Sequence, residues 1–403
     1  MPAIGEVRIR KVLDSRGRPT VEVDVRAGAF LGRAGAPSGA STGIYEARAF
    51  PDAGIDEAIR TFRTEVAPRL KGHDVLDQTG IDERLHAIDG TANFSRIGGN
   101  VATAASLACA KAAAAAKGLP LFRSLGGPKG RGMPFPFGNI IGGGRHAISG
   151  TTIQEFLAVA QGPRVAQNVL ANARVHGLLR EVLIAKFPGA PLGRGDEGAW
   201  VAKLGDEEAL ALLADACRRV EQEVGFPVRP ALDLAASEFY RDGTYRYPDR
   251  TLAQGGQIEF LERLVRDYGI YSLEDPLHQE DFEGFALLTK AIGSRCLVIG
   301  DDLFATNLQR FRDGIARRAA NAILIKPNQI GTLTDTRAAV DLAAKAGYAT
   351  VVSHRSGETT DDTIAHLAVA FGSLGIKAGA VGGERIAKLN ELIRIDEELR
   401  GGT

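Results

Sequence analysis

The sequence has few of the residues that build disulfide or thiolate–metal frameworks. Its three cysteines, Cys109, Cys217 and Cys296, are far apart, odd in number and show no Cys-x-x-Cys spacing. This pattern argues against disulfides and a cysteine zinc site, and it is typical of a reducing compartment. Each cysteine lies in an apolar or helical context, so we expect three small buried thiols.

The sequence also lacks an excess of charge and a long apolar run. Its 49 Lys and Arg residues balance 49 Asp and Glu residues, so bulk charge gives no sign of a nucleic-acid or membrane partner. No apolar run approaches the roughly 20 residues that span a bilayer. The first residues, MPAIGEVRIRKVLDSRG, lack the apolar centre of a signal peptide. We therefore expect a cytoplasmic protein that binds neither nucleic acid nor membrane.

The rest of the composition is that of an ordinary globular protein, and the sequence divides into two parts. The first part has period-two segments, GEVRIRKVLDSRG and PTVEVDVRAG, followed by Ala-rich helical stretches near 54–70 and 99–117. These predict an α+β domain over 1–130, with a three-stranded meander plus helices. A stretch rich in Gly and Pro, 118–136, marks the boundary, and the second domain covers 131–403.

The second part alternates short apolar runs with long amphipathic stretches, which predicts βα units and a parallel sheet. Six successive apolar runs each end at an ionisable residue, spaced roughly one βα unit apart. In an open sheet, distant strand ends could not share one crevice, whereas in a barrel they converge on the C-terminal face. We therefore predict an α/β fold with a (β/α)8 barrel whose site includes Asp233, Glu274, Asp301, Lys326, His354 and Lys377.

The types of these residues indicate metal and proton chemistry. Asp233, Glu274 and Asp301 would repel one another unless a cation lay between them, and all-oxygen ligands suit Mg²⁺ or Mn²⁺. Lys326 and Lys377 follow on later strands of the same face. An ammonium near a divalent cation and a second ammonium should have a lowered pKa, so Lys326 is a candidate general base.

Three further segments supply polar candidates. SHRSGET contains His354, Arg355 and Ser356, a pattern suited to clamping a phosphate or carboxylate. GRGDEGAW places Glu197 between glycines, where an acid can approach a ligand closely. Taken alone, this segment would equally fit an acidic turn with no role in chemistry. GGGRHAISGTTIQEF supplies His146, Gln154 and Glu155, and a lone histidine would more often be structural.

Taken together, these segments resemble the enolase family (phosphopyruvate hydratases), nearly from end to end. The motifs that carry the resemblance are long and specific: LDSRGRPTVEV, PSGASTG, KGLPLF, NIIGGGRHA, GDEG, LDLAASEFY, SLEDP, GDDLFATN, ILIKPNQIGT, VVSHRSGET and GERIAKLNELIRIDEEL. The resemblance implies a barrel of enolase type and reversible dehydration of 2-phosphoglycerate to phosphoenolpyruvate. It also implies two Mg²⁺ ions in each active site and a homodimer or homo-octamer.

The resemblance further implies a role for individual residues. Lys326 matches the base that removes the C2 proton, and Glu197 matches the acid that assists departure of the C3 hydroxyl. Glu155 and His354 complete the catalytic set. Ligands of the first Mg²⁺ correspond to Asp233, Glu274 and Asp301, and Ser41 matches a ligand of the second. The substrate contacts correspond to His146, Gln154, Arg355, Ser356, Lys377 and Ser41.

The sequence departs from the family pattern at several places near the site, including the residues after GDEG and Ala378 after Lys377, and two departures bear on the substrate. The segment after PSGASTG is shorter than usual, and Arg145 stands where the family has a small residue, which adds a cation beside the predicted pocket. These departures motivate an alternative, an enolase paralogue of secondary metabolism that dehydrates a phosphonate analogue. A non-enzymatic alternative is a scaffold or a surface-binding role.

Overall fold

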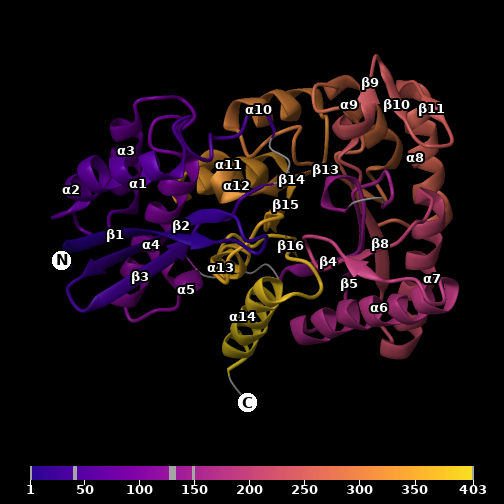
Figure 1. Ribbon diagram of the computed structural model, residues 1–403, viewed down its shortest axis with the longest axis horizontal. Coiled ribbons are helices and arrows are strands. Elements are labelled where there is room, and N and C mark those ends of the chain that lie inside the picture. The colour runs from indigo at the N-terminus through magenta and orange to yellow at the C-terminus, as the bar shows by residue number, and fades with distance from the viewer. Residues whose placement is uncertain (1, 40–42, 127–132, 148–149, 402–403) are drawn as a thin grey trace.

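The computed structural model describes residues 2–39, 43–126, 133–147 and 150–401, and the chain folds into two parts (Figure 1). The first part begins with an antiparallel sheet in the order β1-β2-β3, formed by β1 (Ile4–Leu13), β2 (Pro19–Ala27) and β3 (Phe30–Gly35). This is the predicted three-stranded meander. Val21, Val23 and Val25 lie at alternate positions of β2 and are fully buried, which explains the period-two pattern.

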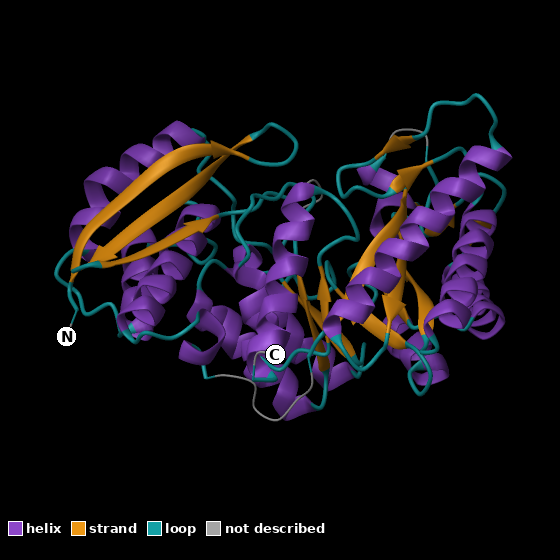
Figure 2. Ribbon diagram, turned by 90° about the horizontal axis from the view of Figure 1, so that it is seen from below, coloured by secondary structure: helices purple, strands orange, loops and turns teal. Residues whose placement is uncertain are grey.

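Helices cover one side of this sheet (Figure 2). They are α1 (Ile55–Thr61), the π-helical turn η1 (Phe62–Val66), α2 (Ala67–Leu70), α3 (Gln78–Asp89), α4 (Gly99–Ala116) and α5 (Leu121–Ser124). The Ala-rich α4 packs directly on β3, where a Cβ added at Gly32 would lie 1.9 Å from the backbone oxygen of Ala108. Small residues on both elements therefore allow the helix to approach the sheet closely.

Eight strands of the second part close into a barrel, as predicted, because β16 pairs with β4. In order around the barrel they are β4 (Phe135–Gly142), β5 (Glu155–Ala160), β8 (Val228–Asp233), β12 (Ser272–Glu274), β13 (Leu297–Gly300), β14 (Ala322–Ile325), β15 (Ala349–Ser353) and β16 (Gly375–Lys377). From β8 to β16 and on to β4 every neighbouring pair is parallel.

The prediction of a wholly parallel sheet is wrong at β5, which runs antiparallel to both β4 and β8. In its described residues, the connection from β4 to β5 contains only the short 3-10 turn η2 (Gly144–His146). A parallel crossover usually needs a helix, so this link returns the chain as a hairpin-like pair. As a consequence Glu155, the first residue of β5, lies opposite Asp233, the last residue of β8.

Helices surround the barrel and short strands extend it. A hairpin of β6 (Gly193–Arg194) and β7 (Trp200–Val201) joins the barrel at β4. A small separate sheet follows the 3-10 turn η3 (Ala236–Phe239) and consists of β9 (Tyr240–Arg241), β10 (Thr244–Arg246) and β11 (Thr251–Leu252). The helices are α6 (Val165–Lys186), α7 (Asp206–Val224), α8 (Gln254–Tyr268), α9 (Phe282–Ile292), α10 (Leu308–Arg317), α11 (Pro327–Ile330), α12 (Leu333–Ala346), α13 (Thr363–Ala370) and α14 (Gly383–Leu399). Within the described ranges, each helix is too short or too polar to traverse a bilayer.

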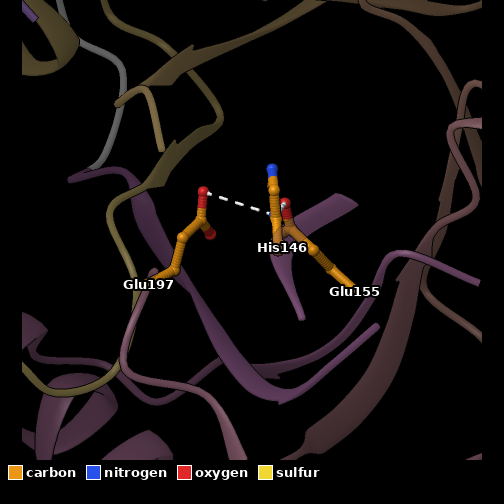
Figure 3. A group of neighbouring side chains, drawn as sticks. All are labelled: His146, Glu155 and Glu197. Carbon is orange, nitrogen blue, oxygen red and sulfur yellow. Dashed lines mark ion pairs between the residues drawn. The ribbon is translucent and has the colours of Figure 1, made fainter. Parts of the chain in front are cut away.

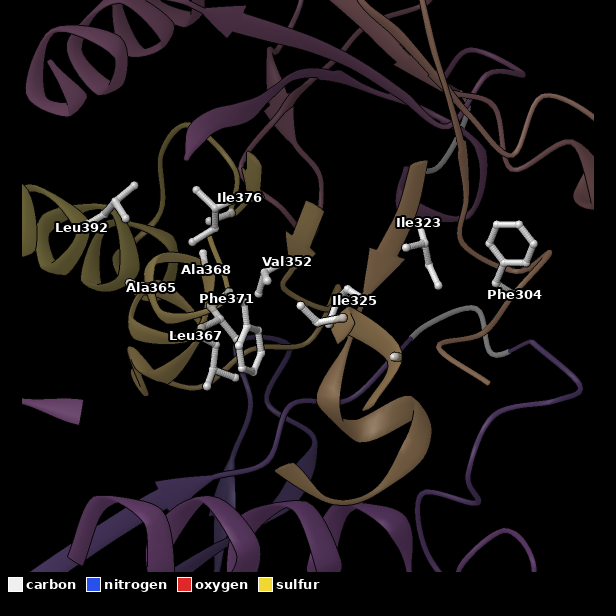
Figure 4. Close-up of a cluster of buried hydrophobic side chains, with 14 of the residues drawn as sticks. Phe304, Ile323, Ile325, Val352, Ala365, Leu367, Ala368, Phe371, Ile376 and Leu392 are labelled. Carbon is white, nitrogen blue, oxygen red and sulfur yellow. The ribbon is translucent and has the colours of Figure 1, made fainter. Parts of the chain in front are cut away.

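The alternation of side chains along β14 explains where its terminal lysine points. Ile323 and Ile325 belong to the layer between the strands and the surrounding helices (Figure 4), whereas Ala322 and Leu324 belong to a separate cluster inside the barrel. Lys326 follows with the inward parity of Leu324. The lysine at the end of an apolar strand therefore faces the interior at the C-terminal end of the barrel.

Candidate active site

The six ionisable residues predicted from the strand ends lie at the C-terminal ends of six successive strands. Asp233, Glu274 and Lys377 are the last residues of their strands, and Asp301, Lys326 and His354 follow theirs directly. A small cavity opens beside five of them, all but Glu274. Its described lining consists of Gly39, His146, Gln154, Glu155, Glu197, Asp233, Asp301, Lys326, Ser353, His354, Arg355, Ser356 and Lys377.

Lys377 lies between two of the predicted metal ligands. Its Nζ donates to Asp233 Oδ2 at 2.9 Å and to Glu274 Oε1 and Oε2 at 3.0 and 2.9 Å, and it lies 3.3 Å from Glu155 Oε1. Burial lowers the pKa of Lys377, but these carboxylates outweigh it and raise the pKa well above its usual value. Lys377 is therefore a permanent cation that holds the acidic strand ends together.

Lys326 forms a buried ion pair with Asp301, the third predicted ligand. Burial lowers the pKa of Lys326, yet the charge of Asp301 raises it above the usual value. This direction belongs to the ion pair of the protein alone, whereas the lowered pKa was predicted for a lysine beside a divalent cation. Asp301 also accepts a hydrogen bond from Gln329 Nε2 at 2.9 Å, so both members of the pair have fixed positions.

A second acidic group surrounds His146 (Figure 3). His146 Nδ1 lies 3.4 Å from Glu155 Oε1 and 3.8 Å from Glu197 Oε1, and Asn139 Nδ2 donates to Glu197 Oε2 at 3.1 Å. Burial and the charge of Glu197 raise the pKa of Glu155. Burial also raises the pKa of Glu197, but the charges that His354 and His146 carry when protonated outweigh it and lower the pKa. The environment thus moves the pKa values of the two carboxyl groups in opposite directions.

Arg355 and Ser356 lie at the side of the cavity that faces the first domain. Arg355 donates to both carboxylate oxygens of Glu46, at 2.8 and 3.1 Å, and to Asn328 Oδ1 at 2.9 Å. Ser356 Oγ accepts a hydrogen bond from Arg16 Nη1 at 3.2 Å. Sequence reasoning missed Glu46 and Arg16, although each lies within or beside a motif of the resemblance.

The other predicted positions are placed as follows. Gln154 Nε2 donates to Asp233 Oδ2 at 3.3 Å, while its buried Oε1 has no hydrogen-bond partner among the described residues. Ser41 lies outside the described residues. Arg145 is 55% exposed and forms an ion pair with Glu238 at 2.7 Å, and it is not among the described residues that line the cavity. Arg145 thus lies beside the lining residue His146, and its charge is paired with Glu238.

The acidic residues at the strand ends fit a hard divalent cation. Burial and the charge of Asp233 raise the pKa of Glu274 well above its usual value, because the neighbouring carboxylates repel one another. Two groups of three described residues could each hold a metal ion, because the ligand atoms within each group lie within 4.8 Å of one another. One group is His146, Glu155 and Glu197, and the other is Asp275, Asp301 and Asp302. The predicted triad is neither group, because Lys377 lies between Asp233 and Glu274. Carboxylate oxygens are the ligands that Mg²⁺ prefers.

Buried acids, lysines and histidines that converge on the C-terminal face of a closed barrel define a barrel enzyme with an acid–base site. Comparison with known proteins narrows this class. The profile of the enolase N-terminal domain matches residues 4–125, and that of the enolase C-terminal TIM barrel domain matches residues 131–403. The chain belongs to the enolase family, and it is a lyase of that family.

Curated relatives agree with this assignment over nearly the whole chain. The enolase of Methanothermobacter thermautotrophicus is 54% identical over 402 residues, which cover 98% of this chain and 97% of the relative. The enolase of Natronomonas pharaonis is 54% identical over 401 residues, covering 98% and 99%. The enolase of Picrophilus torridus is 49% identical over 396 residues, also covering 98% and 99%.

Proposed function

We propose that the chain catalyses the reversible dehydration of 2-phosphoglycerate to phosphoenolpyruvate. The observation that carries this proposal is the convergence of Lys326, Glu197 and two of the strand-end carboxylates, Asp233 and Asp301, on one cavity, in a chain about half identical to enolases over almost all of its length.

In this proposal Lys326 removes the proton from C2. Its Nζ stands at the cavity wall, held by Asp301, so the base meets the substrate in a fixed direction. Asp233, Glu274 and Asp301 would hold one Mg²⁺, and Ser41 would contribute to a second. When bound, these cations supply positive charge to the substrate carboxylate, on which negative charge develops. Because Asp301 would then share its charge, the attraction that keeps Lys326 protonated becomes weaker.

Glu197 assists the second half of the reaction. It can hold a proton only while His354 and His146 are neutral, because their charges lower its pKa. In that state it donates the proton as the C3–oxygen bond breaks, so the hydroxyl leaves as water and the electron pair of C2 forms the double bond. Glu155 and His354 flank this acid, and His146 contacts both carboxylates. We assign the phosphate to Arg355 and Ser356, and further contacts to the substrate to Gln154, His146 and Lys377.

The alternatives receive less support. The phosphonate alternative was motivated by Arg145, whose charge is paired with Glu238 outside the cavity lining. A scaffold or surface-binding protein has no need for buried acids and lysines of this density, which are costly to bury. The resemblance supports a cytoplasmic homodimer or homo-octamer, and we propose these as well.

A direct assay tests the proposed reaction. Purified chain with Mg²⁺ and 2-phosphoglycerate should produce phosphoenolpyruvate, followed by its ultraviolet absorbance, with a carboxyphosphonate analogue run in parallel. Arg145→Ala is the matched variant, and we expect it to leave the preference between the two substrates unchanged. Negligible turnover of 2-phosphoglycerate beside rapid turnover of the analogue would overturn the proposal.

A further inference from the structure

Arg385 is a fully buried arginine, near the start of α14, that sequence reasoning left without a role. Its Nη1 lies 2.7 Å from His354 Nδ1 and donates to the backbone oxygen of Arg355 at 2.7 Å. Its Nη2 donates to the backbone oxygens of Ser356 at 2.6 Å and Asp196 at 3.3 Å. One guanidinium therefore joins the segment of the predicted phosphate clamp to the segment of the predicted acid.

The contact with His354 determines where the imidazole carries its proton. A guanidinium has five N–H donors, no acceptor, and stays charged at all ordinary pH values. Nδ1 of His354 can approach it at 2.7 Å only as an unprotonated acceptor. We propose that Arg385 is a positioning residue that holds His354 as the neutral tautomer with its proton on Nε2.

The surroundings of the ring support this assignment. Nε2 lies 3.2 Å from Glu197 Oε2, on the side of the ring opposite Arg385, and it makes no hydrogen bond with the described residues. The backbone N–H of His354 is fixed separately, on the backbone oxygen of Lys377 at 2.9 Å. Burial lowers the pKa of His354 to about 3, and the positive charges of Arg385 and Lys377 act in the same direction against the charge of Glu197.

The tautomer has a consequence for the acid. A protonated His354 would favour the carboxylate form of Glu197, and a carboxylate has no proton to give to a leaving hydroxyl. A neutral His354 instead offers one N–H beside Glu197 without adding a positive charge. Arg385 thus acts on the reaction through His354 and does not itself line the described cavity. This consequence rests on the proposed function, whereas the tautomer does not.

Nitrogen-15 NMR of the intact chain, labelled at histidine and free of substrate, tests the tautomer directly. We expect His354 Nδ1 to show the shift of an unprotonated ring nitrogen and Nε2 that of a protonated one, unchanged from about pH 6 to 8. The signals are assigned by their loss in His354→Gln. An imidazolium, or a proton on Nδ1, would overturn the inference. Because no turnover is measured, this result is independent of whether 2-phosphoglycerate is the substrate.

Variants then test the catalytic consequence. Arg385→Met removes the donor, and we expect kcat to fall about 10- to 100-fold with a smaller change in KM, as for other residues that orient a functional histidine. Arg385→Lys keeps one donor and should restore part of kcat. Arg394→Met, at an exposed position of the same helix, is the control. An Arg385→Met protein with wild-type His354 ring signals would overturn the inference, and the wild-type NMR measurement decides it if that variant does not fold.

Discussion

Glu46 and Arg355 are 309 positions apart in the sequence and form a buried ion pair in the folded chain. Both side chains are almost completely inaccessible, and both carboxylate oxygens of Glu46 accept a hydrogen bond from the guanidinium. Glu46 lies before the first helix of the N-terminal part, whereas Arg355 follows barrel strand β15. The predicted phosphate clamp is therefore oriented by a residue from outside the barrel.

Replacing Glu46 by Gln should destabilise the chain and weaken substrate binding. The substitution removes the negative charge from a buried ion pair, and breaking such a pair costs about 3 kcal/mol. We expect a lower free energy of unfolding, measured with urea, and a raised KM because Arg355 loses one of its anchors.

Glu57→Gln is the matched control for this variant. Glu57 pairs with Arg60 one helical turn away on the exposed face of α1, where ion pairs contribute little. Equal unfolding midpoints for the two variants would show that the Glu46–Arg355 pair has no special importance.

Lys326→Met should abolish most of the activity without preventing binding. Loss of a positioned general base typically lowers the rate about 10²- to 10⁴-fold. The thermal stability should change less than the activity, since Met fills a similar volume and Asp301 keeps its hydrogen bond from Gln329. Exchange of the C2 proton of 2-phosphoglycerate with deuterium, followed by NMR, isolates this step.

The exposed Lys290→Met on α9 controls for the loss of one positive charge. If Lys326→Met still exchanged the C2 proton at the wild-type rate, another residue would be the base.

The sequence allowed the barrel and the residues at its strand ends to be predicted because both follow from local periodicity. An apolar run with inward parity, as in Ala322, Leu324 and Lys326, specifies which way its last residue points. The reversal of β5 was missed, since run length alone does not reveal strand direction. Glu46 and Arg385 were missed because each meets its partner only after distant segments have packed.

The charge pattern inside the site was also beyond local reasoning. Three carboxylates at successive strand ends suggested a shared cation, and the structure places Lys377 between two of them. That position depends on closure of the barrel, which brings β16 across from β8 and β12. The ion pair between Lys326 and Asp301 was beyond prediction for the same reason, because the distance between the two residues is a property of the closed sheet.

Mg²⁺ should stabilise the wild-type chain in proportion to its binding. A ligand that binds only the folded state at a hundred times its Kd adds about 2.7 kcal/mol. We expect the Tm to rise as Mg²⁺ is added and to fall after treatment with EDTA. Asp233→Asn should remove most of this response, because it deletes one predicted ligand.

Asp215→Asn, on the exposed surface of α7, is the control and should respond to Mg²⁺ as the wild type does. A response that survived in Asp233→Asn would place the ion elsewhere.

The contact between His86 and Asp335 should make the stability of the chain depend on pH. His86 Nε2 on α3 lies 2.7 Å from Asp335 Oδ2 on α12, so the pair joins the two parts of the chain. The hydrogen bond to Asp335 outweighs burial and raises the pKa of His86 above 6.5. The stabilisation is therefore fully present below pH 6.5 and is lost as the pH rises through the folded-state pKa. We expect His86→Gln to lose stability relative to the wild type at about pH 5.5 and to approach it at higher pH, measured by urea unfolding across that range. His73→Gln is the matched histidine replacement and should follow the wild type throughout, whereas parallel curves for the wild type and His86→Gln would contradict the coupling.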